Sequence, residues 1–214
     1  MNFRKNILSN SFIFSLLLIV VIFSLGAMKV YQTGKLESNG SGSIKITYSA
    51  KADELKTNKY IIGNFPFSED LAKKQFASAN NTVKNVKLDF DKKESVYYMT
   101  VEVDFKDINK ITEAKGFSNI KASYVKSSSG MDFQYIILAN PGLYKNFANQ
   151  SYIIEFESKV KTTNGALKDN TVTWGNKNSS NSDFSKDVIL KATTEADESL
   201  TSNNESSGKD EGKS

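Results

Sequence analysis

Residues 85–105 read NVKLDFDKKESVYYMTVEVDF, and the fold class follows from their pattern. Apolar and polar side chains alternate on both sides of a short charged turn at 91–94. The apolar positions on one face are Val86, Leu88, Phe90, Tyr97, Met99, Val101, Val103 and Phe105. A period of two is typical of half-buried strands, so this segment predicts a β-hairpin with one apolar and one solvated face.

Two more segments show the same alternation. Residues 120–138 alternate around a polar turn at 127–130, which predicts a second hairpin. A third hairpin is predicted from residues 152–160 and 170–174, with its turn near Asn164-Gly165. These hairpins indicate a largely antiparallel sheet.

Helical signals are few. Ser68 fits an N-cap position before Glu69 and Asp70, which predicts one helix over 69–79. A shorter helix is predicted to start at Asp107 and to end at Gly116. With a last short strand at 188–190, the chain is expected to form an α+β domain that has a largely antiparallel sheet and one or two short helices.

The amino-terminal segment is continuously apolar: residues 12–28 read FIFSLLLIVVIFSLGAM. A helix over 7–28 would span about 33 Å, enough to cross a bilayer, so we predict a transmembrane helix within residues 1–30. Arg4 and Lys5 precede this run, which places the amino terminus in the cytoplasm and the domain outside. The alternative is a cleavable signal peptide that is cut near Ser24-Leu25-Gly26.

Composition divides the chain into four parts. The signal-anchor or transmembrane helix at 1–30 is followed by a flexible linker at 31–42, because Ser38 to Gly42 are small and polar. The extracytoplasmic domain is expected over 43–192. Residues 193–214 carry six acidic residues and two lysines, and we predict a disordered acidic tail there.

The 214 residues contain neither His nor Cys. This excludes zinc sites built on those ligands, Ser-His-Asp and Cys-His nucleophiles, and disulfides. There are 28 Lys and Arg residues against 24 acidic ones, but Arg4 is the only arginine, which argues against a nucleic-acid partner. We expect no enzyme activity, no catalytic residue, no cofactor and no metal site.

Four carboxylates are expected to lie close together on the polar face of the first hairpin: Asp89, Asp91, Glu102 and Asp104. A weak calcium site is one interpretation of this cluster. Lysines at several neighbouring positions favour the other interpretation, a solvated charged face.

The segment from Asn140 to Asn149 carries three large apolar side chains between two strands. Leu143, Tyr144 and Phe147, with Lys145 among them, either close one end of the core or form a contact surface for lipid or protein. Trp174, the only tryptophan, alternates with Val172, which favours a core position over a ligand platform. These residues (Leu143, Tyr144, Lys145, Phe147 and Trp174) are the candidate contact surface.

The end of the chain resembles the closing pattern of the LppM-like bacterial envelope domains. The matching segments are Val160-Lys161-Thr162-Thr163-Asn164-Gly165, Asn170-Thr171-Val172-Thr173-Trp174 and Val188-Ile189-Leu190-Lys191-Ala192. The resemblance extends over residues 43–192 and implies an exported, anchored domain without established catalysis, and with a hint of lipid contact. Where a lipid-anchored member carries Cys, this chain has Ala27 or Met28.

Taken together, these features predict a noncatalytic module on the outside of a bacterial cytoplasmic membrane, held by a single-pass helix. The first hypothesis for its function is a protein-interaction subunit of an envelope assembly. The alternative is a lipid or glycolipid binding module, which needs an apolar cavity or an exposed apolar rim.

Overall fold

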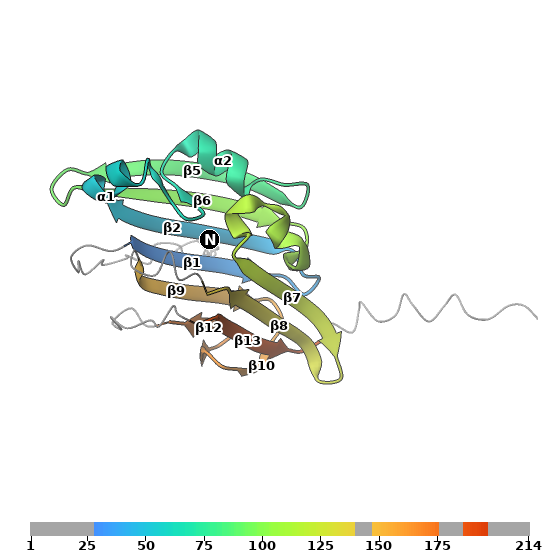
Figure 1. Ribbon diagram of the computed structural model, residues 1–214. Coiled ribbons are helices and arrows are strands. Elements are labelled where there is room, and N and C mark those ends of the chain that lie inside the picture. Colours follow the sequence, from blue (N-terminus) through green and yellow to red (C-terminus); the bar gives the residue numbers. More distant parts are fainter. Residues whose placement is uncertain (1–27, 140–146, 176–185, 197–214) are drawn as a thin grey trace, which may run out of the picture.

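The computed structural model describes residues 28–139, 147–175 and 186–196 (Figure 1). The strands in chain order are β1 (Met28–Leu36), β2 (Gly42–Lys51), β3 (Ile61–Ile62), β4 (Phe65–Pro66), β5 (Asn81–Asp91), β6 (Val96–Phe105), β7 (Ile120–Ser127), β8 (Gly130–Ile137), β9 (Phe147–Phe156), β10 (Val160–Thr163), β11 (Ala166–Lys168), β12 (Thr171–Trp174) and β13 (Val188–Thr194). The helices are α1 (Ala52–Thr57), α2 (Glu69–Phe76) and two 3-10 helices, η2 (Ile108–Glu113) and η3 (Lys115–Phe117). The expected fold class, a mostly antiparallel β-sheet domain with few short helices, is confirmed.

The strands form two main sheets. The larger sheet has seven strands in the order β11-β12-β9-β1-β2-β6-β5, and the smaller has four in the order β10-β13-β8-β7. Neighbours in the larger sheet are antiparallel except β1 and β9, which run parallel. Strand β1 therefore lies in the middle of the larger sheet.

The prediction of a flexible linker at 31–42 is wrong, because most of this range belongs to β1. The inward positions of β1 include Gln32 and Gly34 between the buried residues Val30 and Leu36, and these two residues hide the apolar alternation. The Ser38–Gly42 segment is a tight connection, in which the Glu37 N–H donates to the Ser41 carbonyl over 2.8 Å. The small polar residues of this segment form a tight turn and not a flexible linker.

The first two predicted hairpins are confirmed. Strands β5 and β6 pair with Phe90 opposite Tyr97 and Leu88 opposite Met99. Strands β7 and β8 pair up to Ser127 opposite Gly130, around a two-residue turn. Alternation and turn chemistry were sufficient here because the partner strands are neighbours in the sequence.

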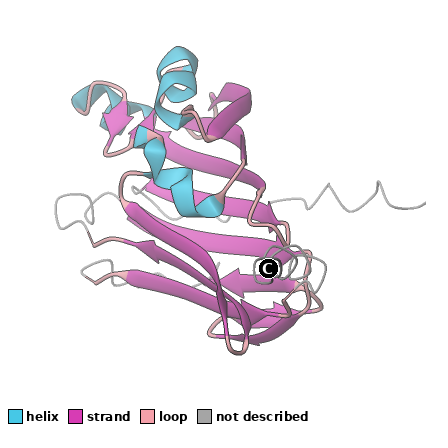
Figure 2. Ribbon diagram, turned by 90° about the vertical axis from the view of Figure 1, so that its right-hand side faces the viewer, coloured by secondary structure: helices cyan, strands magenta, loops and turns pink. Residues whose placement is uncertain are grey.

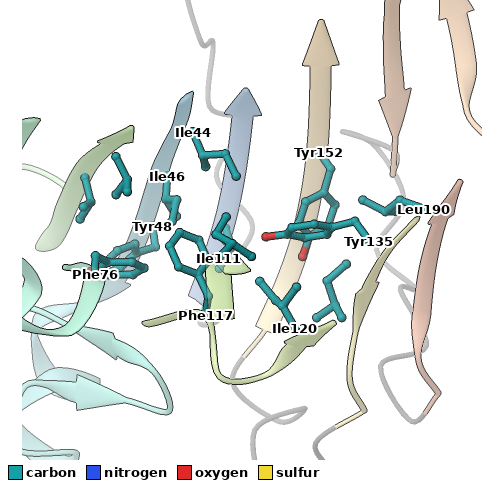
Figure 3. Packing of buried hydrophobic residues seen from close by; sticks show 14 of the residues in the cluster. Ile44, Ile46, Tyr48, Phe76, Ile111, Phe117, Ile120, Tyr135, Tyr152 and Leu190 are labelled. Carbon is teal, nitrogen blue, oxygen red and sulfur yellow. The ribbon is translucent and has the colours of Figure 1, made fainter. Parts of the chain in front are cut away.

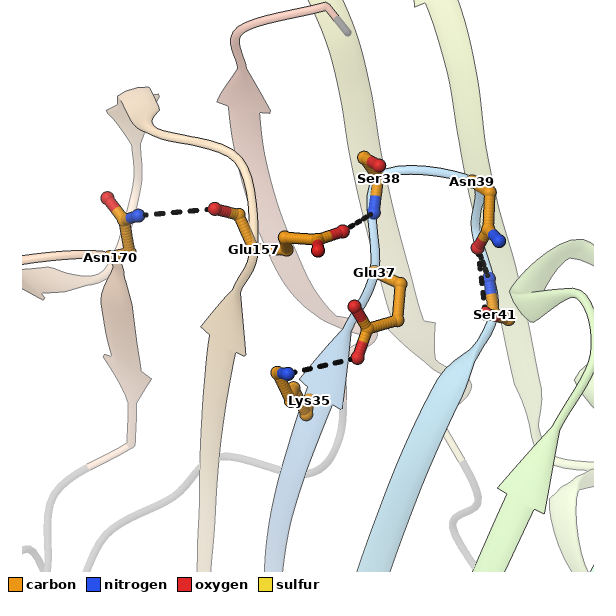
Figure 4. A network of polar contacts seen from close by, with 7 residues as sticks. All are labelled: Lys35, Glu37, Ser38, Asn39, Ser41, Glu157 and Asn170. Atoms are coloured by element: carbon orange, nitrogen blue, oxygen red, sulfur yellow. Dashed lines mark hydrogen bonds and ion pairs between the residues drawn. The ribbon is translucent and has the colours of Figure 1, made fainter. Parts of the chain in front are cut away.

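The third predicted hairpin is wrong. Strand β12 pairs with β9 as expected, but the chain leaves β9 at Phe156, and β10 joins the smaller sheet beside β13. At the crossing, the Glu157 N–H donates to the Leu36 carbonyl, and the Glu157 carboxylate accepts from the Ser38 N–H over 2.8 Å (Figure 4). This hydrogen bond lowers the pKa of Glu157. The alternation of side chains continues from residue 152 to residue 160. It therefore does not indicate that the chain leaves one sheet and enters the other within this range.

Both predicted helical regions are present, with different ends and geometry. Helix α2 stops at Phe76, because the Ser78 hydroxyl accepts from the Asn80 and Asn81 N–H groups and turns the chain into β5. Ser68 occupies the N-cap position of α2, without a side-chain cap hydrogen bond. The region after Asp107 forms two 3-10 helices, and the Asp107 side chain accepts from the Asn109 N–H over 2.9 Å.

Two groups of elements cover different parts of the inner face of the larger sheet (Figure 2). The helices and the β3-β4 ribbon pack over β2, β5 and β6, where Phe76 meets Phe117 edge-on with ring centroids 5.2 Å apart. The smaller sheet packs over β1, β9 and β12, and Figure 3 shows Tyr135 of β8 against Tyr152 of β9. The other face of the larger sheet is called the outer face below.

The predicted ends of the domain lie partly outside the described residues. Thr193 and Thr194 belong to β13, so the predicted tail begins too early; Thr194 is buried, and its hydroxyl lies 2.9 Å from that of Tyr124. Residues 197–214 of the predicted tail and residues 1–27 of the predicted transmembrane helix lie outside the described residues. In the part of the chain that the structure describes, no helix is both long and apolar enough to cross a membrane.

Candidate interaction surface

Three aromatic side chains form a patch at one end of the larger sheet, in which Tyr60 and Phe90 are exposed and Tyr97 is half-buried. Phe90 stacks on Tyr97 with ring centroids 4.4 Å apart, and Tyr60 meets Tyr97 edge-on at 6.4 Å. Tyr60 is 41% exposed and Phe90 is 43% exposed, so two neighbouring aromatic side chains present apolar surface to solvent. Tyr60, Phe90 and Tyr97 are called the aromatic patch below.

The backbone that presents Tyr60 is strained. Lys59 and Tyr60 both adopt left-handed conformations, with φ angles of 53° and 61°. For a residue other than glycine this conformation costs about 1 kcal/mol or more, and it persists only where surrounding contacts impose it. Here the Tyr60 N–H donates to the Leu55 carbonyl, and the Tyr60 carbonyl accepts from the Phe67 N–H, both over 2.8 Å.

The β5-β6 hairpin positions the other two rings. Phe90 and Tyr97 are directly opposite on the inner face, one residue pair before the turn. The Asp91 carboxylate fixes this turn by accepting from the N–H groups of Lys93 and Glu94, at 2.9 and 3.1 Å. The turn is tied to α1, because the Ala52 N–H donates to the Ser95 carbonyl. Two separate segments therefore hold the aromatic patch in one arrangement.

The outer face carries the carboxylates that the sequence placed together. Lys45 pairs with Glu102 at 3.0 Å, Lys84 with Asp104 at 3.6 Å and Lys87 with Asp89 at 2.9 Å. Each of these acids has a lysine, and Asp91 is engaged by the hairpin turn. Among the described residues, no group of three or more acidic side chains is arranged to hold a metal ion.

Between the two sheets, the described residues line a small apolar cavity that is partly open. Its volume is about 20 Å³, and Gln32, Tyr135 and Tyr152 contribute to its lining. The Tyr135 hydroxyl donates to Gln32 Oε1 over 3.1 Å. A space of this size holds about one water molecule, so this cavity does not take an acyl chain.

The predicted contact residues are not brought together in the described structure. Leu143, Tyr144 and Lys145 lie outside the described residues, and Phe147 is the first residue of β9, opposite Met28 of β1. Trp174 is buried: its indole N–H donates to Asn164 Oδ1 over 2.7 Å, and its ring lies 6.1 Å from that of Phe133. The prediction of Trp174 as a contact residue is therefore wrong, and its core interpretation holds.

The sequence contained part of the signal for the aromatic patch. Phe90 and Tyr97 were placed on one apolar face beside a turn, where few residues remain to cover them. Tyr60 gave no such signal. Its exposure depends on a left-handed backbone, and a tyrosine at position 60 does not indicate this conformation as a glycine or an asparagine would.

The comparisons with known proteins include a distant likeness among solved structures. No family model and no curated protein matches the chain. Among solved structures, the folded domain of LppM from Mycobacterium tuberculosis, determined by NMR, is similar with a TM-score of 0.45 and 13% sequence identity. The match covers 83% of this chain and 96% of that domain. It is a distant likeness of fold, from which neither family membership nor function follows.

Proposed function

We propose that this chain is a noncatalytic interaction module of the bacterial cell envelope, which binds another envelope protein through the aromatic patch. The observation that carries the proposal is the exposure of Tyr60 and Phe90 on a strained but well-fixed backbone. The location outside a membrane rests on the apolar run at residues 12–28 and on the basic residues that precede it.

The chemistry of the patch favours a protein partner. Binding energy at protein interfaces concentrates in a few aromatic side chains, which bury a large area and have few rotatable bonds. Tyr60 and Phe90 are already held by their ring contacts with Tyr97, which lies in the β5-β6 hairpin. Little side-chain entropy is therefore lost when a partner covers the patch. Backbone strain at Lys59 and Tyr60 is typical of positions where presentation of a side chain outweighs local stability.

The proposal is tested by purification of the chain from its native membrane, followed by mass spectrometry of what copurifies. We expect a stoichiometric protein partner with the wild type. Tyr60→Ser and Phe90→Ser should each lower its recovery about tenfold or more, because truncation of an interface aromatic removes about 2 kcal/mol.

The matched control is Val125→Ser, which changes another exposed apolar residue, 51% exposed on β7 and away from the patch. Its partner recovery should equal that of the wild type. Equal recovery with all variants would show that the patch is not the binding surface. Stoichiometric lipid in place of protein would favour a lipid-binding module.

A further inference from the structure

Strand β5 is an edge strand of the larger sheet, and with 11 residues it is the longest strand described (Figure 1). Among the described strands, none pairs with the open side of β5. The Leu88 N–H points to that side, since it donates to the Glu69 carboxylate over 2.9 Å and not to β6. Residues two apart in a strand face the same way, so Val86 and Phe90 also direct their backbone groups outward.

The other described sheet edges have fewer backbone N–H and carbonyl groups that could pair with another strand. At β7, the Asn109 side chain accepts from the Tyr124 N–H over 2.7 Å and donates to the Tyr124 carbonyl over 3.3 Å, which occupies the edge. Strands β10 and β11 have only four and three residues. Exposed edges of this kind are templates for pairing with another strand.

Within β5, only a short segment is suited to pairing. The register with β6 shifts between Val83 and Asn85, and Lys84 lies in this bulge. Bulges and edge lysines disfavour strand addition. Past the bulge, residues 86–90 form a regular run, along which α2 packs against β5 and its Glu69 carboxylate occupies the Leu88 N–H.

We propose that two copies of this chain associate through their β5 edges, antiparallel, about a two-fold axis at Leu88. In this arrangement each Leu88 N–H donates to the Leu88 carbonyl of the second copy and leaves Glu69. The inference goes beyond the proposed function, because it rests on the middle of β5 and makes no use of Tyr60; Phe90 is the one residue that both proposals use.

Side-chain complementarity selects the register. When Leu88 lies opposite Leu88, each Lys87 lies opposite Asp89 of the second copy, and each Val86 lies opposite Phe90. This register gives two opposite-charge pairs on the outer face and three apolar pairs on the inner face, the combination that stabilises antiparallel strands. Both charged side chains are available, since Lys87 and Asp89 have side-chain exposures of 64% and 53% in their present pair.

The alternative registers that use the same outward backbone groups are poorer. A two-fold axis at Lys87 or at Asp89 places that residue opposite its own copy, which is a like-charge contact. A two-fold axis at Phe90 places Asp89 opposite Asp91, which is a like-charge contact. An axis at Val86 places Lys87 opposite Asn85 and forms no ion pair between the copies. Opposite charges therefore favour the Leu88 register.

The pairing of five residues buries less surface than a stable dimer interface needs, so the association should be weak and concentration-dependent. The absence of cysteine from the chain allows a direct test of register in the full chain. Leu88→Cys should form a disulfide-linked dimer on mild oxidation, because opposed residues have Cα atoms about 5.5 Å apart. Val86→Cys alone should not, because the two copies of residue 86 would be about 14 Å apart along the strands.

The charge pairs are tested by sedimentation of the full chain in detergent over a range of concentrations. Lys87→Asp should weaken self-association about tenfold, and the exchange K87D/D89K should restore it to within about threefold of the wild type. Lys45→Asp is the matched control, since Lys45 pairs with Glu102 in the interior of the same face, and it should have no effect. Glu69→Ala should strengthen association several-fold, whereas Glu69→Gln, which keeps an acceptor for Leu88, should behave as the wild type.

Equal cross-linking by Leu88→Cys and Val86→Cys would overturn the register, and an exchange variant that stays as weak as Lys87→Asp would overturn the charge pairing. A monomer at every concentration would overturn the proposal as a whole. The proposed function fails separately, because Tyr60→Ser should leave self-association unchanged and Lys87→Asp should leave the copurifying partner bound.

Discussion

At the scale of single residues, three tyrosines are buried with their hydroxyl groups engaged. Tyr48 donates to the Pro66 carbonyl over 2.6 Å, Tyr135 donates to Gln32, and Tyr152 donates to Gln150. Burial raises the pKa of all three phenols above its usual value near 10. The folded state therefore keeps them neutral at a pH where the unfolded chain ionises them.

This difference predicts a loss of stability in alkali. Below about pH 10 the phenols are protonated in both the folded and the unfolded state, so their full contribution to the free energy of unfolding is present. As the pH rises further, only the unfolded chain releases protons. The free energy of unfolding should then fall by up to about 4 kcal/mol per pH unit for three groups. Urea unfolding at pH 9, 10 and 11 measures the fall, and Tyr152→Phe should reduce its slope by up to about 1.4 kcal/mol per pH unit, the largest contribution of a single group. A free energy of unfolding that is flat over this range would contradict the burial of the phenols.

The sequence predicted single residues well only where their neighbours were local. The core interpretation of Trp174 followed from its alternation with Val172, and the structure buries both side chains. Tyr60 was missed, since its exposure arises from hydrogen bonds to Leu55 and Phe67 that no pattern around residue 60 indicates. Leu143, Tyr144 and Lys145 stay a prediction.

At the scale of elements, pairing between adjacent strands could be predicted and pairing between distant ones could not. The β5-β6 and β7-β8 hairpins followed from alternation and turn residues. The parallel pair of β1 and β9 joins segments more than 100 residues apart, such as Val30 and Gln150, and nothing in either segment indicates the other. The Asn164-Gly165 turn was expected to reverse one hairpin, and it instead connects β10 of one sheet to β11 of the other.

Asn164 joins the two sheets through its side chain. Its Oδ1 accepts from the Trp174 indole N–H at 2.7 Å and from the Lys191 N–H at 2.8 Å, while its Nδ2 donates to the Ile189 carbonyl at 2.8 Å. Asn164→Ala leaves these three groups without their partner, and we expect it to lower the free energy of unfolding by about 2 to 3 kcal/mol. Asn164→Asp keeps the acceptor for both N–H groups and should lose less. Denaturant unfolding of the two variants gives the comparison, and equal losses would contradict the role assigned to Oδ1.

At the scale of the whole molecule, the domain boundaries are set by strand pairing and not by composition. The polar residues after Leu36 resembled a linker and those after Ala192 resembled a tail. Both segments are nevertheless held: Leu36 accepts from the Glu157 N–H, and the Glu195 N–H donates to the Lys159 carbonyl. Composition detects where apolar residues become scarce, but it does not detect backbone hydrogen bonds to a distant strand.

Two shortened chains test where the domain begins and ends. A chain of residues 43–192, the domain expected from composition, lacks β1 and the end of β13. Without β1, the backbone groups of β2 and β9 that face it lose their partners in the middle of the larger sheet, and buried Val30 and Leu36 are removed from the core. We expect this chain not to fold, whereas residues 28–196 retain every described strand and should unfold cooperatively. Circular dichroism and thermal unfolding distinguish the two. A folded 43–192 chain with a similar midpoint would mean that β1 is an addition to the sheet and not its centre.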